Sequence, residues 1–430
     1  MNLKKINELF NFEKGVLQST KCEDGAYDFI TAAAEWKKNK EYSHNCEALI
    51  FAAAASGSLG RTHYVNGKFI SSDLCFILTP NDSKNFPVDL QFYHIIFNLY
   101  KNDIVAATKA GTSKEAIGLK VFGEYKLPYF EMSLQRKVKA DFGDAESLKN
   151  KLFNEYNFQL TQISNLNQAI LQEAVQGKLV KQDPKDEPAS ELLKRIKAEK
   201  AKSGKKEKPL PPIKPEEIPF EIPESWVWCR LGEICDNITK GSSPNWQGVE
   251  YVSENDGILF ITSKNVDSFK IDLTKATYVE EKFNKIEPRS ILRKGDILTN
   301  IVGASIGRTA LFDLDVVANI NQAVCILRIE HNLINKDYLL NLMNSNLALK
   351  LMTDSSFAPG RANLSMGNIS NFPIPLPPYF EQKRIVAEIE KQIAKTKQIQ
   401  EHITANQQAT EQLLKALLHQ AFEVEETQEV

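Results

Sequence analysis

Cysteine, long apolar runs and clustered metal ligands are scarce in this sequence. Only six of the 430 residues are cysteines and no two form a CxxC pair, so their spacing suits neither a zinc site nor a disulfide framework. The longest apolar run, residues 48–55, is too short to cross a bilayer, and the basic amino terminus lacks the apolar core of a signal peptide. Scattered free thiols fit a reducing compartment. We therefore expect a soluble cytoplasmic protein.

Catalytic motifs are missing as well. The sequence contains neither a GxxxxGK[ST] phosphate-binding loop nor an HExxH zinc motif. Residues 376–379, L-P-P-Y, resemble a tetrapeptide of amino-methyltransferases whose first residue accepts hydrogen bonds from the target amine, but Leu376 cannot accept one. A bare E-x-K at residues 280–282 is too weak to indicate a nuclease. We expect no catalytic residue, metal or cofactor on this chain.

The overall charge is nearly balanced. Fifty-three basic and 55 acidic residues give a formal net charge of −2. This excludes a chain held to DNA by net charge alone, although local basic surfaces are still compatible with DNA binding.

The chain repeats itself. S-L-G-R-T at residues 58–62 matches S-I-G-R-T at 305–309, and an apolar run with one cysteine follows each, at residues 74–78 and 324–328. L-P-Y-F-E at 127–131 matches P-P-Y-F-E at 377–381, and A-I-L-Q-E-A-V-Q at 169–176 resembles Q-L-L-K-A-L-L-H at 412–419. The four pairs keep the same order at offsets of 243 to 250 residues. This predicts a duplicated module, with the two copies related by a pseudo-twofold axis.

Each half of the sequence begins with a mixed α/β segment and ends with a helical segment. Short β-rich runs such as residues 257–262 and 297–302 alternate with turn residues, whereas residues 147–179 and 381–422 carry apolar residues at steps of three and four. The latter pattern predicts two helices of roughly 50 and 60 Å. We expect them to pair in a coiled-coil-like seam rather than to pack separately on their own domains. Thr396, Asn406 and Thr410, near the apolar stripe of the second helix, would fix register and partner.

A linker separates the halves. Residues 194–208 hold eight Lys or Arg and two Glu, a pattern more typical of a solvated, mobile segment than of a phosphate contact. The proline-rich stretch 209–223 predicts a stiff, extended crossing.

These features together resemble type I restriction–modification specificity subunits. The resemblance rests on P-L-P-P-Y-F-E-Q-K-R-I-V at residues 375–386, N-L-N-Q-A-I-L-Q-E-A-V-Q-G-K-L-V at 165–180, I-P-E-S-W-V-W-C-R-L-G at 222–232 and G-A-S-I-G-R-T at 303–309. It implies an α+β fold with two similar target-recognition domains separated by two long antiparallel helices. The expected parts are a first recognition domain (1–143), a central spacer helix region (144–200), a linker (201–222), a second recognition domain (223–378), a C-terminal spacer helix (379–422) and a flexible tail (423–430).

The resemblance further implies a non-catalytic subunit that reads a split DNA sequence, one half per domain. Its partners would be double-stranded DNA, two methyltransferase subunits that carry S-adenosylmethionine, and restriction subunits that use ATP and Mg²⁺. The alternatives are a specificity subunit of a related type II-like system, a nuclease with an undetected acidic site, and a helical scaffold that does not contact DNA.

Polar loop residues that differ between the two copies are the expected readers of DNA, because the two half-sequences differ. Residues shared by both copies should instead hold the fold; these are Gly60, Arg61, Gly307 and Arg308. The candidate readers are Lys109, Thr112, Ser113, Lys114, Lys240, Ser242, Ser243, Asn245 and Arg361.

Overall fold

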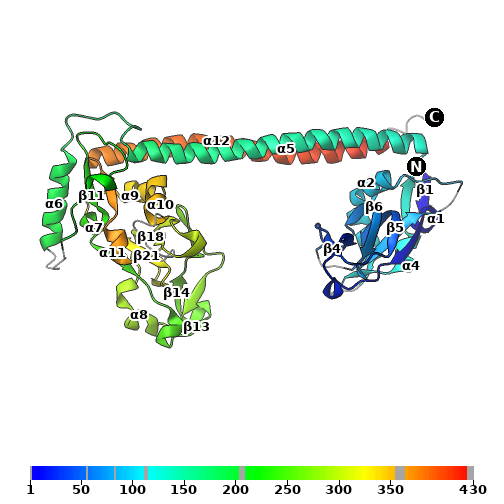
Figure 1. Ribbon diagram of the computed structural model, residues 1–430, viewed down its shortest axis with the longest axis horizontal. Coiled ribbons are helices and arrows are strands. Elements are labelled where there is room, and N and C mark those ends of the chain that lie inside the picture. Colours follow the sequence, from blue (N-terminus) through cyan, green and yellow to red (C-terminus); the bar gives the residue numbers. More distant parts are fainter. Residues whose placement is uncertain are drawn as a thin grey trace. The chain divides into compact units, whose positions relative to one another are not determined.

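The computed structural model describes residues 2–54, 57–81, 84–110, 115–202, 209–353 and 364–423. The chain divides into two compact units, Met1–Asn157 with Thr404–Val430, and Phe158–Ile403. Each unit contains one mixed α/β module and part of each of two long helices, α5 (Met132–Val175) and α12 (Tyr379–Glu423) (Figure 1).

The module of the first unit is built on a six-stranded sheet in the order β2-β7-β5-β6-β3-β4. Its strands are β2 (Phe10–Lys14), β3 (Tyr27–Ile30), β4 (Lys37–Asn39), β5 (His44–Ala52), β6 (Thr62–Ser71) and β7 (Cys75–Pro80). A separate pair joins β1 (Asn2–Lys5) to β10 (Lys126–Tyr129), and a short hairpin joins β8 (Lys109–Ala110) to β9 (Ala116–Ile117). The helices are α1 (Ile6–Leu9), α2 (Leu90–Leu99), α3 (Lys101–Thr108) and α4 (Leu119–Glu124).

The module of the second unit repeats this plan. A sheet in the order β12-β21-β18-β19 takes the place of β2-β7-β5-β6, and the pair β11-β22 takes the place of β1-β10. The strands are β11 (Val227–Arg230), β12 (Asn237–Lys240), β18 (Asp296–Asn300), β19 (Thr309–Phe312), β21 (Val324–Arg328) and β22 (Pro373–Leu376). The helices α7 (Leu231–Ile234), α9 (Lys336–Met343), α10 (Asn346–Thr353) and α11 (Met366–Ser370) follow in the order of α1 to α4.

Matching side-chain contacts confirm the duplication. Asn98 at the end of α2 donates its side-chain N–H to the carbonyl of Thr62 (3.1 Å), and Asn344 just after α9 donates to the carbonyl of Thr309 (2.9 Å). Each acceptor is the first residue of the strand that follows the S-x-G-R turn. The same polar contact thus ties the same helix to the same strand in both copies.

The start of each long helix is fixed by an equivalent glutamine. The side-chain carbonyl of Gln135 accepts from the backbone N–H of Asp89 (2.7 Å), and that of Gln382 accepts from the N–H of Asn335 (2.8 Å). Asp89 and Asn335 are in turn the N-cap residues of α2 and α9. Both glutamine side chains are fully buried, so the beginning of each long helix is part of its module's core.

The two modules differ between their first two shared strands. In the second unit this segment contributes β13, β14 and β17 to a sheet in the order β13-β17-β14-β20, which β20, after β19, completes; it also forms a helix α8 (Lys282–Ile286), where the first unit has a 3-10 turn (Ser19–Lys21), β3 and β4. The added sheet consists of β13 (Tyr251–Val252), β14 (Ile258–Ile261), β17 (Thr277–Val279) and β20 (Ala318–Ile320), and a small hairpin joins β15 (Val266–Asp267) to β16 (Lys270–Ile271). The parallel pairing of β14 with β20 corresponds to that of β3 with the end of β6. The insertion therefore enlarges a shared frame.

The long helices extend further than their sequence pattern predicts. Helix α5 spans Met132–Val175 and α12 spans Tyr379–Glu423, so the first helix begins about fifteen residues earlier than the expected residue 147 and takes in what was assigned to the first domain. The charged start of α5 hid this boundary, because its apolar periodicity is weak there. The helices are antiparallel, since Asn157 pairs with Gln407 in the first unit and Asn167 with Thr396 in the second.

Part of the predicted apolar stripe does not lie between the helices. Ile163, Ile170 and Ile389 are buried as expected, but Leu166 is half exposed and Leu413 is 60% exposed. The pattern of steps of three and four is wider than a two-helix seam, so some of its members face solvent.

Polar contact within the seam is confirmed at Thr396. Its hydroxyl lies 2.8 Å from Oδ1 of Asn167, and the Thr396 side chain is nearly buried. A polar pair among apolar residues costs stability when mispaired, and it therefore favours one register of the two helices.

We expect this pair to be energetically coupled. Asn167→Leu or Thr396→Val alone should each lower the free energy of unfolding by about 1 kcal/mol, because the hydrogen bond between the two side chains is lost while one polar group remains in the seam. The double variant Asn167→Leu/Thr396→Val should recover most of that loss, which a double-mutant cycle of denaturant unfolding measures. The exposed pair Asn157 and Gln407, 3.4 Å apart, is the matched control and should show no coupling. Additive losses at Asn167 and Thr396 would contradict the assignment.

The linker is more ordered than its charge predicts. Residues 194–202 of the basic run belong to helix α6 (Ala189–Lys202), which buries Leu192, Leu193 and Ile196. The ammonium group of Lys200 donates to the carbonyls of Gly232 and Cys235, both at 2.7 Å. The expectation of a mobile segment is therefore wrong for these residues, because an apolar stripe lies under the lysines; residues 203–208 lie outside the described part of the chain.

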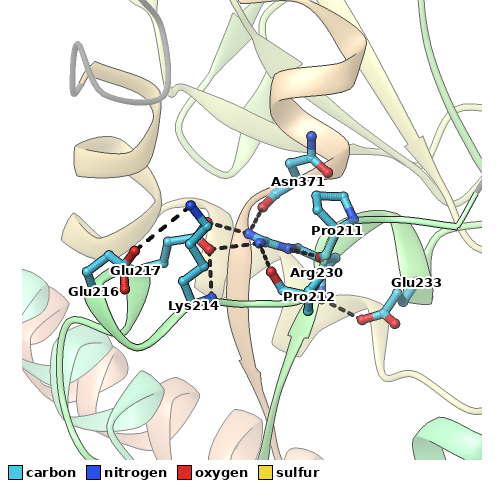
Figure 2. Close-up of polar contacts among 8 residues, drawn as sticks. All are labelled: Pro211, Pro212, Lys214, Glu216, Glu217, Arg230, Glu233 and Asn371. Carbon is cyan, nitrogen blue, oxygen red and sulfur yellow. Dashed lines mark hydrogen bonds and ion pairs between the residues drawn. The ribbon is translucent and has the colours of Figure 1, made fainter.

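One buried arginine holds the proline-rich stretch against the second module. Figure 2 shows Arg230 donating to the carbonyls of Pro211 (3.0 Å) and Pro212 (2.9 Å), to the carbonyl of Asn371 (2.6 Å) and to both carboxylate oxygens of Glu217 (2.7 and 2.9 Å). All five guanidinium N–H groups thus have acceptors. The stretch crosses in an extended form, as predicted, apart from one turn at Pro215–Glu217.

Candidate nucleic-acid interface

Three loops of each module leave the shared sheet at the same edge. In the first unit β2 ends at Lys14 opposite Phe76, which also pairs with Phe51 near the end of β5, and Phe51 pairs with Thr62 at the start of β6. The loops after β2, between β5 and β6, and before β7 therefore lie together. We call this the loop edge of the module.

The second unit has the same loop edge. Lys240, the last residue of β12, pairs with Cys325, which pairs with Thr299 of β18, and Thr299 pairs with Thr309 at the start of β19. The S-x-G-R turns of both copies and the predicted readers Lys240 to Asn245 are thus brought to equivalent edges.

The loop after the first shared strand begins with a glycine that the packing requires. A Cβ on Gly15 would lie 2.2 Å from the carbonyl oxygen of Ser72, and a Cβ on Gly241 would lie 1.8 Å from that of Ile320. Only glycine allows this close approach of two backbones. Both loops therefore start from the same anchored point, and their following residues differ completely: V-L-Q-S-T-K at 16–21 and S-S-P-N-W-Q at 242–247.

The predicted readers of the second loop lie at its exposed side. Lys240 and Asn245 are exposed, and Ser242 and Ser243 are partly exposed. The Ser242 hydroxyl accepts from the side-chain N–H of Gln247 (3.1 Å), so this side chain also stabilises the loop.

The S-x-G-R turns are built alike. Gly60 and Gly307 adopt positive φ values of 81° and 88°, which favour glycine, and each donates its N–H back to the preceding strand. Arg61 donates to the carbonyl of Ala32 (3.0 Å), as an internal anchor should. Arg308 instead is about half exposed and lies 3.6 Å from Asp267, so it contributes less to the fold than the shared motif suggests.

The second turn also matches the G-x-S-x-G pattern of a nucleophile elbow, at residues 303–307. Such an elbow joins a strand to a helix, whereas this turn joins the antiparallel strands β18 and β19. The pattern therefore marks a strand connection here and not a hydrolase.

A further loop of each module is tied to this edge. Ile117 donates its backbone N–H to the carbonyl of Ala53 (2.8 Å), and Leu364 donates to that of Ile301 (3.3 Å), so both loops between the third and fourth helices end beside the S-x-G-R turn. Lys109 is exposed and lies 2.8 Å from Glu115. Four predicted readers in these loops lie outside the described residues: Thr112, Ser113, Lys114 and Arg361.

The cysteines at this edge are not nucleophiles at neutral pH. Burial raises the pKa of Cys75 to about 12 and the pKa of Cys325 further still. Both thiols therefore stay protonated and act as small core residues. Within the described ranges, no cluster of three or more His, Cys, Asp or Glu side chains could hold a metal ion, and no helix is long and apolar enough to cross a membrane.

Sequence reasoning missed the first copy's counterpart of residues 242–247, namely residues 16–21. Val16, Gln18, Ser19, Thr20 and Lys21 are all exposed in that loop. A usable pattern was present, because Lys-Gly precedes both loops, at residues 14–15 and 240–241. The offset of 226 residues differs from the other repeats, since the second copy carries its insertion after this point, and this hid the match.

Comparison with known proteins agrees with a duplicated module carrying two loop edges. The family described as type I restriction modification DNA specificity domain matches residues 1–138 and 223–406. The chain belongs to this family, and its two matched segments coincide with the two copies.

Individual relatives fit the same family. The chain is 34% identical over 278 residues to the type I restriction enzyme EcoEI specificity subunit of Escherichia coli, covering 60% of this chain and 45% of the relative. It is 33% identical over 247 residues to the EcoAI specificity subunit of the same organism, covering 54% and 40%. The matches thus span less than half of each of these relatives.

The fold also matches a solved structure. A chain from a study of complex assembly and conformational transition of the type I R-M system aligns with a TM-score of 0.58 at 18% identity, over 98% of this chain and 97% of that one. The two mixed modules and the two long antiparallel helices that the sequence predicts are confirmed.

Proposed function

We propose that the chain is the non-catalytic specificity subunit of a type I restriction–modification complex, in which each module reads one half of a split DNA target. One observation carries the proposal: a shared frame, anchored by equivalent contacts in both copies, presents loop edges whose polar residues differ. A frame held constant while its exposed loops vary is what reading two different half-sequences requires.

The two long helices set the distance between the half-sites and bind two methyltransferase subunits. Their exposed faces carry apolar side chains that their own pairing does not cover, among them Phe158, Phe380 and Leu413, each exposed by more than half. Large exposed apolar residues favour a protein partner.

Catalysis belongs to those partners. S-adenosylmethionine is carried by the methyltransferase subunits, and ATP and Mg²⁺ by restriction subunits. A chain with a net charge of −2 can still bind DNA if these partners share the phosphate contacts.

Methylome sequencing tests the proposal. Cells that express this chain with its proposed methyltransferase partner are expected to methylate a split motif, two short half-sequences at a fixed gap. Deleting the chain should abolish that methylation. A continuous motif, or methylation that persists without the chain, would contradict the proposal. Mg²⁺-dependent cutting of DNA by the purified chain alone would favour a nuclease instead, and a split motif without any ATP-driven subunit would favour a type II-like system.

A further inference from the structure

The most exposed large hydrophobic side chains of the two units lie in equivalent loops. Among the described residues, Val16 is the most exposed of these side chains in the first unit (68%) and Trp246 in the second (76%). Val16 is the first residue after the anchoring Gly15, and Trp246 is the fifth after Gly241. Apolar side chains at such exposure cost free energy in water, and both lie on the loop edge of their module.

The frame under each loop is rigid. In the second unit the backbone N–H of Val249 donates to the carbonyl of Pro244 (3.0 Å), and the side-chain N–H of Gln247 donates to Ser242 and to Glu287, both at 3.1 Å. Gly248 closes the turn with a positive φ of 66°. The indole of Trp246 is thus presented from a loop whose backbone is fixed on both sides.

The first unit holds its loop in a comparable way. The N–H of Asp73 donates to the carbonyl of Leu17 (3.1 Å), and the N–H of Lys21 donates to that of Gln18 (2.9 Å). A bridge between Leu17 and Ser72 adds the loop to the end of the sheet.

We infer that these two loops, residues 16–21 and 242–247, are the segments that distinguish the two half-sequences, with Trp246 packing directly against the DNA of the second half-site. This rests on the proposed function and adds which segments read each half. Three observations support it: an identical anchor, unrelated sequences beyond the anchor, and an exposed apolar side chain on each loop. Apolar side chains read double-stranded DNA by contact with the thymine methyl group in the major groove.

Because the two segments are each six residues long, one can replace the other without changing the length of the chain. A variant in which residues 242–247 carry V-L-Q-S-T-K is expected, in the full complex, to change the second half of the methylated motif and to leave the first half and the gap as they were. The unchanged first half shows within the same molecule that the variant is folded and assembled.

A point variant tests Trp246 separately. Trp246→Ala should weaken binding of the full chain with its partners to a duplex oligonucleotide carrying the native motif by roughly ten- to a hundredfold. The slope of affinity against salt should stay the same, since no phosphate contact is lost. Val317→Ala is the matched control, because Val317 is 62% exposed but follows β19 at the opposite edge of the sheet; its binding should be unchanged.

The outcomes separate the two proposals. If the native complex methylates no split motif, the proposed function fails. If it does, but loop exchange leaves both half-sequences intact and Trp246→Ala binds as the native chain does, the function stands and the inference about these loops is overturned.

Discussion

A variant with four residues inserted in each long helix, near Leu166 in α5 and near Ile399 in α12, is expected to direct methylation to a motif whose gap is one or two base pairs longer. Four residues add about 6 Å of helix, and a base pair rises about 3.4 Å. Both insertions lie between the two contacts that pair the helices, Asn157 with Gln407 and Asn167 with Thr396, so both contacts can be kept. Four residues are also close to one turn, which nearly preserves the inward faces. Methylome sequencing reads the gap and both half-sequences in one experiment.

The matched control is the same insertion in α5 alone. Because one helix is lengthened and its partner is not, the two helices cannot form both contacts at the same time. We therefore expect loss of methylation rather than a longer gap. If the double insertion leaves the gap unchanged while methylation continues, the helices do not set the spacing.

Replacing Arg230 with alanine is expected to destabilise the second unit by about 3–5 kcal/mol. Arg230 is only 3% exposed, and its removal takes two hydrogen bonds from the Glu217 carboxylate, which keeps the backbone N–H of Lys214, and removes the arginine donor from three backbone carbonyls. A buried charge that loses its partner costs far more than the pair contributed. Thermal and denaturant unfolding measure the loss, and limited proteolysis should show earlier cleavage within residues 209–223, the stretch that Arg230 holds (Figure 2).

The first copy supplies the control at the equivalent position. Lys5 ends β1 as Arg230 ends β11, and each donates its backbone N–H to a glutamate three residues on. The Lys5 side chain, however, pairs with Glu124 in solvent, and exposed pairs contribute little. Lys5→Ala should therefore leave unfolding unchanged; a comparable loss in both variants would mean that the position in the fold matters and the buried ion pair does not.

The same contact predicts a pH dependence. Hydrogen bonds from Arg230 lower the pKa of Glu217 below its ordinary value of 4.5. Because the folded-state pKa is the lower one, the stabilisation is present above pH 4.5 and is lost as the pH falls through the folded-state value. The native chain should lose stability in this acid range more steeply than Arg230→Ala, which no longer has the pair. Equal slopes would contradict this assignment.

The order of the modules and long helices could be predicted from the sequence, because the duplication left recognisable repeated motifs in it. The S-x-G-R turns, the cysteine-containing strands and the starts of the long helices each occur twice in one order, and the structure confirms that they occupy equivalent places. The apolar periodicity predicted that the two long helices exist. It did not predict where they begin or which residues lie between them. Leu166 and Leu413 fit the period and still face solvent, since period fixes a face of a helix and not what covers it.

The sequence by itself determined a duplicated mixed module, two long helices and the absence of recognisable catalytic motifs, because these depend on local spacing. Only the tertiary structure decided which loops share an edge, that residues 16–21 correspond to residues 242–247, and that Arg230 is buried among five acceptors. Those facts depend on strand pairing and on backbones meeting across long stretches of chain. A basic residue at the end of a strand looks the same in sequence at Lys5 and Arg230; the tertiary surroundings leave the first in solvent and enclose the second.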